Sequence, residues 1–209
     1  MKPLLLLACT LVFVTSVHAL PETAPPPARA FRPVGTYLGG LVSPPLPKPR
    51  FTLTDTSGAP FDFWAKTNGH VTLLFFGYTQ CPDECPLHMA NVAMSIKKLP
   101  AEFQDQISLV FVTTDPARDN PRVLRSWLER FDGRFIGLTG TDAAIEAAQR
   151  AAGLPPATKT ARAGGGYAVG HANVVLAYTK DNLAHLMYPG GVTRQDWVHD
   201  LTQLVNERW

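Results

Sequence analysis

The sequence predicts an α/β fold with a central mixed sheet and helices on both of its faces. From about residue 71 to residue 153, apolar runs that fit buried strands alternate with segments of helical periodicity. Strands separated by helices favour parallel pairing, and a last strand pair around Lys180-Asp181-Asn182 adds an antiparallel edge. Because sites in such sheets lie at the carboxyl ends of the strands, we look for function there.

Individual elements follow in chain order. The stretch FTLTDTSGAPFDF from Phe51 alternates in polarity and turns at Ser57-Gly58, which predicts an added N-terminal hairpin. Buried strands are predicted in HVTLLFFGYT, ISLVFVTTD and RFIGLTG, and the last strand pair in NVVLAYT and LAHLMYPGG. Helices are predicted from Glu84 to Leu99 and in NPRVLRSWLERF, TDAAIEAAQRAAG and TRQDWVHDLTQLVNERW. The stretch LPPATKTARAGGGYAVGHA predicts a long loop.

The N-terminus has the pattern of an export signal. MKPLLLLACTLVFVTSVHALPE combines one lysine, a long apolar run and small residues, which predicts a signal peptide over 1–19 that is cut after Ala19. The alternative is an uncleaved anchor, because 18 residues from Pro3 carry no formal charge. A lipoprotein signal at Cys9 is disfavoured by the short apolar run before it. Either reading predicts an exported, periplasmic protein, in contact with a membrane only through this segment.

A proline-rich linker is expected over 20–50, with the folded domain over 51–209. Pro25-Pro26-Pro27 and SPPLPKP favour a stiff, irregular spacer. The 209 residues carry a formal charge of +2, without a run of Lys or Arg, so a nucleic-acid partner is not predicted.

Two cysteines, Cys81 and Cys85, remain after removal of the signal peptide. They follow a predicted strand, with a helix expected to start near Pro82. In an exported protein they can form a disulfide, but a bridge closing so short a loop contributes little stability. A helix N-terminus favours a thiolate there, and two converging thiolates suit Cu(I) better than zinc, which normally takes four ligands. The same pair would also serve thiol–disulfide exchange.

FTLTDTSGAPFDF, LLFFGYTQCPDECP, FVTTDPARDNPRVLRSWLERF and a late histidine together resemble the Sco/SenC family from about Arg50 to Trp209. The resemblance implies a thioredoxin-like fold. It also implies copper bound by Cys81, Cys85 and His171, for assembly of the CuA centre in cytochrome c oxidase subunit II or for another copper-accepting protein. Reduction of cysteines in the partner is a further family role.

The histidine motif departs from the family pattern. An acidic residue commonly precedes this histidine and a serine follows it, whereas Gly170 and Ala172 stand here. His88, three residues after Cys85, is the rival ligand, but it would have to reach back along its own helix. His70, His185 and His199 are expected to be structural.

Other polar residues near the cysteines are assigned supporting roles. Asp115 ends a predicted strand and is expected either to cap the next helix or to support the site and partner docking. Asp119 is expected to cap. Asp83 and Glu84 suit the helix dipole, and Gly77 and Tyr78 are expected to shape and cover the site.

Three further classes of function share these cysteines. A thiol–disulfide oxidoreductase is the main alternative, although the loop before NVVLAYT lacks the proline that such enzymes place opposite their dithiol. A peroxidase is disfavoured because Tyr78 occupies the position expected for a threonine. The same cysteines would also suit a redox sensor.

Overall fold

The computed structural model of the chain describes residues 37–207. The predicted signal peptide and the first part of the predicted linker lie outside these residues. Among residues 37–207, no helix is both long enough and apolar enough to cross a membrane.

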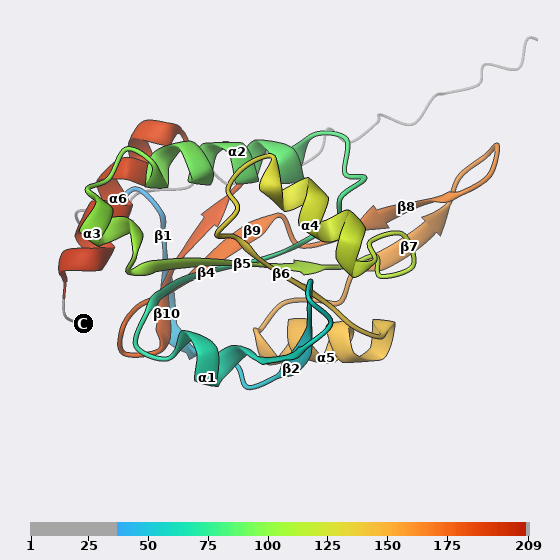
Figure 1. Cartoon of the computed structure of the whole chain (residues 1–209), viewed down its shortest axis with the longest axis horizontal. Helices are drawn as coiled ribbons and strands as arrows, with labels where there is room; N and C mark the ends of the chain where they lie inside the picture. The colour runs from blue at the N-terminus through green and yellow to red at the C-terminus, as the bar shows by residue number, and fades with distance from the viewer. Residues whose placement is uncertain (1–36, 208–209) are drawn as a thin grey trace, which may run out of the picture. The chain divides into compact units, whose positions relative to one another are not determined.

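A mixed eight-stranded sheet forms the centre of the fold (Figure 1). Its strands, in spatial order, are β1 (Gly40–Pro47), β10 (Leu183–Pro189), β9 (Val174–Tyr178), β4 (Val71–Gly77), β5 (Ile107–Thr113), β6 (Ile136–Thr139), β2 (Thr52–Asp55) and β3 (Pro60–Asp62). The pairs β4–β5 and β5–β6 are parallel, and the others are antiparallel. The predicted mixed sheet and the hairpin around Gly58 are confirmed.

Helices cover both faces of the sheet, as predicted (Figure 1). The first face carries α2 (Glu84–Ile96), α4 (Pro121–Glu129) and α6 (Arg194–Asn206), whose buried residues share one apolar cluster. The second face carries α1 (Phe63–Thr67) and α5 (Asp142–Ala151), which belong to another cluster. Neither α1 nor α3 (Ala101–Gln104) is predicted from the sequence, because each is only about one turn long.

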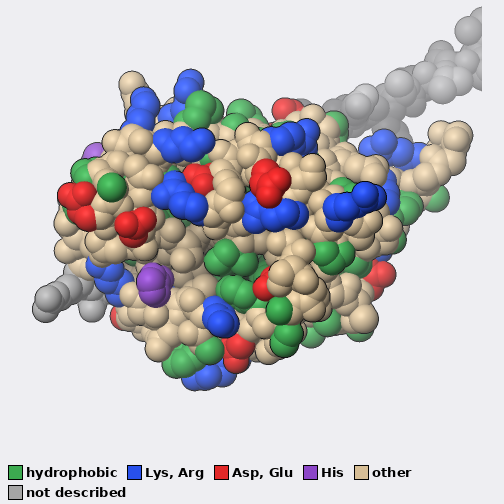
Figure 2. Space-filling view, in the orientation of Figure 1, with side chains coloured by type: hydrophobic (Ala, Val, Ile, Leu, Met, Phe, Trp, Pro, Cys, Tyr) green, Lys and Arg blue, Asp and Glu red, His purple; other side chains and the backbone are tan. Residues whose placement is uncertain are grey.

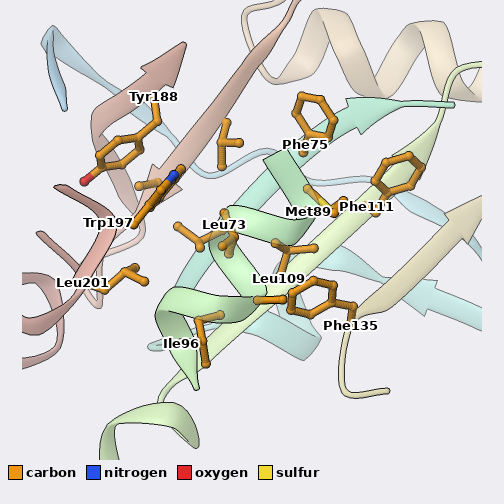
Figure 3. Packing of buried hydrophobic residues seen from close by; sticks show 14 of the residues in the cluster. Leu73, Phe75, Met89, Ile96, Leu109, Phe111, Phe135, Tyr188, Trp197 and Leu201 are labelled. Carbon is orange, nitrogen blue, oxygen red and sulfur yellow. The ribbon is translucent and has the colours of Figure 1, made fainter. Parts of the chain in front are cut away.

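The larger core lies between α2, α6 and the sheet (Figure 3). Met89 and Ile96 of α2 pack towards Leu73 and Leu109 of the central strands, and every residue of β4 is buried. A strand buried on both faces has a continuous apolar sequence, which is why β4 could be predicted from the sequence. This packing fixes the end of β4 and the start of α2, the two points that hold the site.

The predicted linker is wrong from Gly40 onwards. Gly40–Pro47 forms β1, which pairs with β10 at the edge of the sheet, and its register shifts between Leu41 and Leu46. Prolines are tolerated at sheet edges and irregularities because they remove only hydrogen bonds that the strand does not need. Pro44 and Pro45 lie within that shift, so the prolines led to the prediction of a linker where a strand forms.

The predicted long loop also contains regular structure. β7 (Thr158–Ala161) and β8 (Tyr167–Gly170) form a separate antiparallel hairpin that extends away from the main sheet (Figure 1). Its tip holds Gly164, Gly165 and Gly166, all with positive φ, a conformation that glycine adopts readily. The hairpin ends directly before His171, so it helps to place that residue.

Candidate metal site

Both cysteines lie at the junction of β4 and α2. The helix begins at Glu84, the start that its apolar spacing predicts and two residues after Pro82, so Cys81 lies before the helix and Cys85 is its second residue. The Cys81 sulfur accepts a hydrogen bond from the Cys85 backbone N–H, at 3.4 Å. The Asp83 side chain makes no capping bond, so the Cys81 sulfur occupies the place of a helix cap.

His171 lies between β8 and β9 and meets the cysteines. One ligand atom each from Cys81, Cys85 and His171 lies within 4.8 Å of the other two. The Cys85 Sγ is 3.4 Å from the His171 Nε2. Both cysteines are free thiols. Residues separated by 86 positions are thus brought together at the carboxyl end of the sheet.

The orientation of His171 leaves one ring nitrogen available. Nδ1 lies 3.1 Å from the Ala172 carbonyl oxygen, which only accepts, so Nδ1 carries the proton. Burial lowers the pKa of His171, outweighing its hydrogen bonds to the Ala172 and Phe76 backbone. A neutral ring with Nδ1–H leaves the lone pair of Nε2 directed at Cys85. A metal-bound imidazole needs a hydrogen-bond partner for its other nitrogen. The Ala172 carbonyl therefore provides the acceptor that the Gly170 side chain does not provide.

The pKa of the Cys85 thiol is not lowered, although a position at a helix N-terminus would favour the thiolate. Burial raises the pKa of Cys85, and the backbone hydrogen bond from Tyr78 only partly opposes this effect. The expected thiolate at the helix N-terminus is therefore wrong for Cys85. A metal ion must displace the proton of this thiol when it binds.

Apolar groups enclose the site on one side. The Tyr78 ring packs edge-on against His171, with the ring centroids 5.8 Å apart, and Phe75 makes a similar contact. A Cβ atom added at Gly77 would lie 2.9 Å from the Cys85 Sγ, so only glycine fits there. The predicted roles of Gly77 and Tyr78, shaping and covering the site, agree with these contacts.

A hydrogen bond ties the His171 loop to the cysteine helix. The Asn173 amide donates to the Glu84 carboxylate at 2.8 Å. A Cβ atom at Gly190 would lie 2.7 Å from both of these side chains. Glu84 therefore does more than complement the helix dipole, because it also accepts this hydrogen bond. Nothing in the sequence pairs it with Asn173, because contact across 89 positions leaves no local pattern.

Asp119 braces the loop that carries Cys81. This buried carboxylate accepts hydrogen bonds from the Thr79 backbone N–H, the Thr79 hydroxyl and the Thr113 hydroxyl, at 2.6 to 2.8 Å. The predicted capping role of Asp119 is wrong, because Asn120 caps α4. The single hydroxyl proton of Thr79 is therefore directed at Asp119 and not at a cysteine sulfur.

Asp115 lies beside the site without joining the three ligands. Its buried carboxylate accepts a hydrogen bond from the Tyr167 hydroxyl at 2.6 Å and another from Arg118. The Arg118 guanidinium also lies over the rings of Tyr167 and Tyr78. Asp115 is therefore linked to His171 through Arg118 and Tyr78, and among residues 37–207 its side chain caps no helix.

The other histidines of residues 37–207 lie outside the group. His88 is buried on α2 against Phe75, and its Nε2 makes no hydrogen bond of ordinary geometry with the described residues, although the Asn173 side chain is near. His185 pairs with Asp181, and His199 with Asp200.

The donor set of this site is two sulfur atoms and one imidazole nitrogen. Among residues 37–207, no fourth His, Cys, Asp or Glu joins the group. Thiolate and imidazole donors in a three-coordinate set fit copper, whereas a closed zinc site normally takes four protein ligands. The residues present therefore fit a copper ion.

Comparison with known sequences places the chain in a family. Residues 43–206 match SCO1/SenC. The chain belongs to the SCO1/SenC family. A protein of Stutzerimonas stutzeri named "Putative copper-binding protein" is 40% identical over 145 residues, which are 68% of this chain and 69% of that protein. "Protein SenC" of Rhodobacter capsulatus is 37% identical over 103 residues, covering 45% of this chain and 46% of that protein. The chain thus aligns with about half of the length of some SCO1/SenC relatives.

Solved SCO1/SenC structures have the same fold. Apo Sco1 from Thermus thermophilus is 31% identical, with a TM-score of 0.70 over 81% of this chain and 97% of that chain. ScoI from Bradyrhizobium japonicum, solved with copper bound, is 26% identical, with a TM-score of 0.64 over 76% of this chain and 99% of that chain. The predicted thioredoxin-like fold is confirmed.

Proposed function

We propose that this chain is a copper-binding metallochaperone of the Sco type, with Cys81, Cys85 and His171 as the ligands. The observation that carries the proposal is the convergence of their three donor atoms within 4.8 Å of one another. Membership of the SCO1/SenC family, with relatives named as copper-binding or solved with copper, supports the choice of metal.

The three ligands differ in exposure, which suits a protein that gives its copper away. Cys85 is fully buried, whereas Cys81 and His171 are partly exposed. An incoming ligand from an acceptor reaches the exposed donors first and replaces them one at a time. The buried Cys85 thiolate is then the last contact to break. We propose that the acceptor is the CuA site of cytochrome c oxidase subunit II, and that transfer takes place in the periplasm.

A copper-transfer experiment tests this function. The chain loaded with one Cu(I) is mixed with the purified, metal-free CuA domain of subunit II, and copper in each protein is measured after separation. We expect copper to move to the CuA domain. Cys81→Ser and Cys85→Ser should each prevent loading. Retention of all copper by the chain, with a competent acceptor, would contradict the chaperone function.

Thiol–disulfide exchange is the second candidate, because the sulfurs of two free thiols lie within 4.8 Å of each other. The partly exposed Cys81 would be the attacking thiol. The buried Cys85, whose pKa burial raises, is a poor thiolate and would act only to resolve the mixed disulfide. Reduction of an oxidised CuA domain by the metal-free chain, without copper transfer, would favour this candidate.

A further inference from the structure

A groove lies beside Cys81, between the loop after β4 and helix α4. It has a volume of about 560 Å³. Its lining residues are Thr79, Gln80, Arg122, Val123, Ser126, Trp127 and Arg130. Gln80 directly precedes Cys81, so a molecule that occupies the groove lies next to the metal site.

The groove carries positive charge that no acidic side chain of residues 37–207 neutralises. Five arginines lie between residues 118 and 134. Three of them pair with acidic side chains: Arg118 with Asp115, Arg125 with Glu129, and Arg134 with Asp132. The other two, Arg122 and Arg130, line the groove and have no acidic side chain of residues 37–207 within ion-pair distance. Figure 2 shows Lys and Arg side chains, with Asp and Glu side chains among them, over the part of this face where α2 and α4 lie in Figure 1.

Trp127 is the aromatic side chain that lines the groove. Trp127 is only 6% exposed, and its ring packs against Phe111 and Phe131 with centroids 5.0 and 4.9 Å apart. Ser126 and Gln80 add hydrogen-bonding groups at the sides. The Arg130 guanidinium lies over the Trp127 ring, 5.8 Å from its centroid. The groove thus combines one aromatic side chain, polar groups and two cationic groups, which matches a polypeptide segment with two separated carboxylates better than a single small anion.

We propose that this groove docks an acidic segment of the protein that receives the copper, an inference that rests on the proposed function. Arg122 and Arg130 are eight residues apart on the chain, or about 12 Å along a helix axis. An extended segment spans this distance with two acidic residues about four positions apart. Arginine binds carboxylates through paired N–H donors, so each end of the segment gains an ion pair. Such charge pairs mainly raise the association rate and fix the orientation of the partners.

Two short peptides probe the groove directly. Glu-Ser-Ser-Ser-Glu and the neutral Gln-Ser-Ser-Ser-Gln, both with blocked ends, are titrated into the isotope-labelled full chain, and backbone NMR shifts are followed at 20 mM and 200 mM salt. We expect only the acidic peptide to shift Thr79, Gln80 and the amides of α4. Binding should weaken several-fold at the higher salt because screening shortens the range of the charges.

Charge-reversed variants decide where the peptide binds. Arg122→Glu with Arg130→Glu should weaken binding at least tenfold. The control, Lys66→Glu with Arg150→Glu, makes the same change in net charge on α1 and α5, across the sheet, and should leave binding as it is. Unchanged binding in the groove variant, equal loss in the control, or shifts confined to another surface would overturn the proposal.

The copper measurements separate this proposal from the proposed function. The groove variant should bind Cu(I) as tightly as the unmodified chain but deliver it to the CuA domain more slowly, by tenfold or more at low salt. A chain that fails to bind copper contradicts the proposed function, whatever the peptide does. If the groove variant binds copper normally and transfers it as fast as the unmodified chain, only the docking proposal is contradicted.

Discussion

The Asn173 amide donates a hydrogen bond to the Glu84 carboxylate at 2.8 Å, and this bond joins the loop of His171 to the helix of Cys85. Each residue neighbours a proposed ligand, Glu84 by one position and Asn173 by two. Close packing of Gly190 against both side chains restricts their movement. The bond therefore links the backbone segments that carry the imidazole and the Cys85 sulfur.

Removing this bond should lower the Cu(I) affinity more than it lowers the stability of the fold. We expect Asn173→Ala or Glu84→Ala to lower the Cu(I) affinity by about 10- to 100-fold, the range for groups that orient metal ligands. Glu84→Gln should retain most of the affinity, because its amide oxygen still accepts from Asn173. Competition titration and thermal unfolding measured together check this. Glu102→Ala, an exposed helical change, is the control, and an unaltered affinity in both alanine variants would refute the positioning role.

Gly77→Ala should damage the site by crowding. The new methyl group would lie 2.9 Å from the Cys85 Sγ and from a Phe75 ring carbon, closer than such atoms approach in proteins. We expect about 1 to 3 kcal/mol of lost stability and weaker copper binding, because the sulfur must move. Gly133→Ala is the matched control, since nothing lies within 4 Å of its Cβ position. Chemical denaturation of both variants makes the comparison, and equal stability would contradict the crowding.

Asp119→Ala should unfold the loop of Cys81 locally and destabilise the whole domain. The substitution leaves two Thr79 donors and the Thr113 hydroxyl without their acceptor. Losing hydrogen bonds to a buried charge should cost about 3 kcal/mol or more. Urea denaturation measures this loss, and Asp105→Ala, on an exposed residue, should cost much less. A stability equal to that of the unmodified chain would show that Asp119 does not brace the loop.

Cu(I) affinity should rise with pH. Burial raises the pKa of Cys85, so near neutral pH this thiol is protonated and must lose its proton when copper binds. Burial lowers the pKa of His171, so the imidazole is already neutral above its usual titration range. Each proton released adds about a tenfold change in affinity per pH unit. Competition titrations from pH 7 to pH 9 should therefore show at least this slope, and a flat profile would contradict proton displacement from Cys85.

Local sequence patterns predicted the parts of the fold that such patterns encode. The apolar run of β4 indicates burial on both faces, and Asn120 and Pro121 mark the start of α4. The strand β1 was hidden by Pro44 and Pro45, because local propensity does not show that a segment will pair with β10 at an edge. Likewise, the β7–β8 hairpin has the composition of a loop, and its strands form only through mutual pairing.

The candidate site was predictable only where a family motif stands in the sequence. Cys81 and Cys85 are visible from their spacing, whereas His171 was linked to them by resemblance. The Glu84–Asn173 bond and the brace at Asp119 join residues 89 and 40 positions apart. A single sequence carries no signal for such contacts.

A Cu(I) titration of the reduced chain against a competing chelator, with His171→Ala and His88→Ala beside it, decides which residues hold the copper. The structure predicts one tightly bound copper, affinity lowered by at least tenfold in His171→Ala, and affinity almost unchanged in His88→Ala. Loss of affinity in His88→Ala with none in His171→Ala would contradict the proposed Cys81, Cys85 and His171 site.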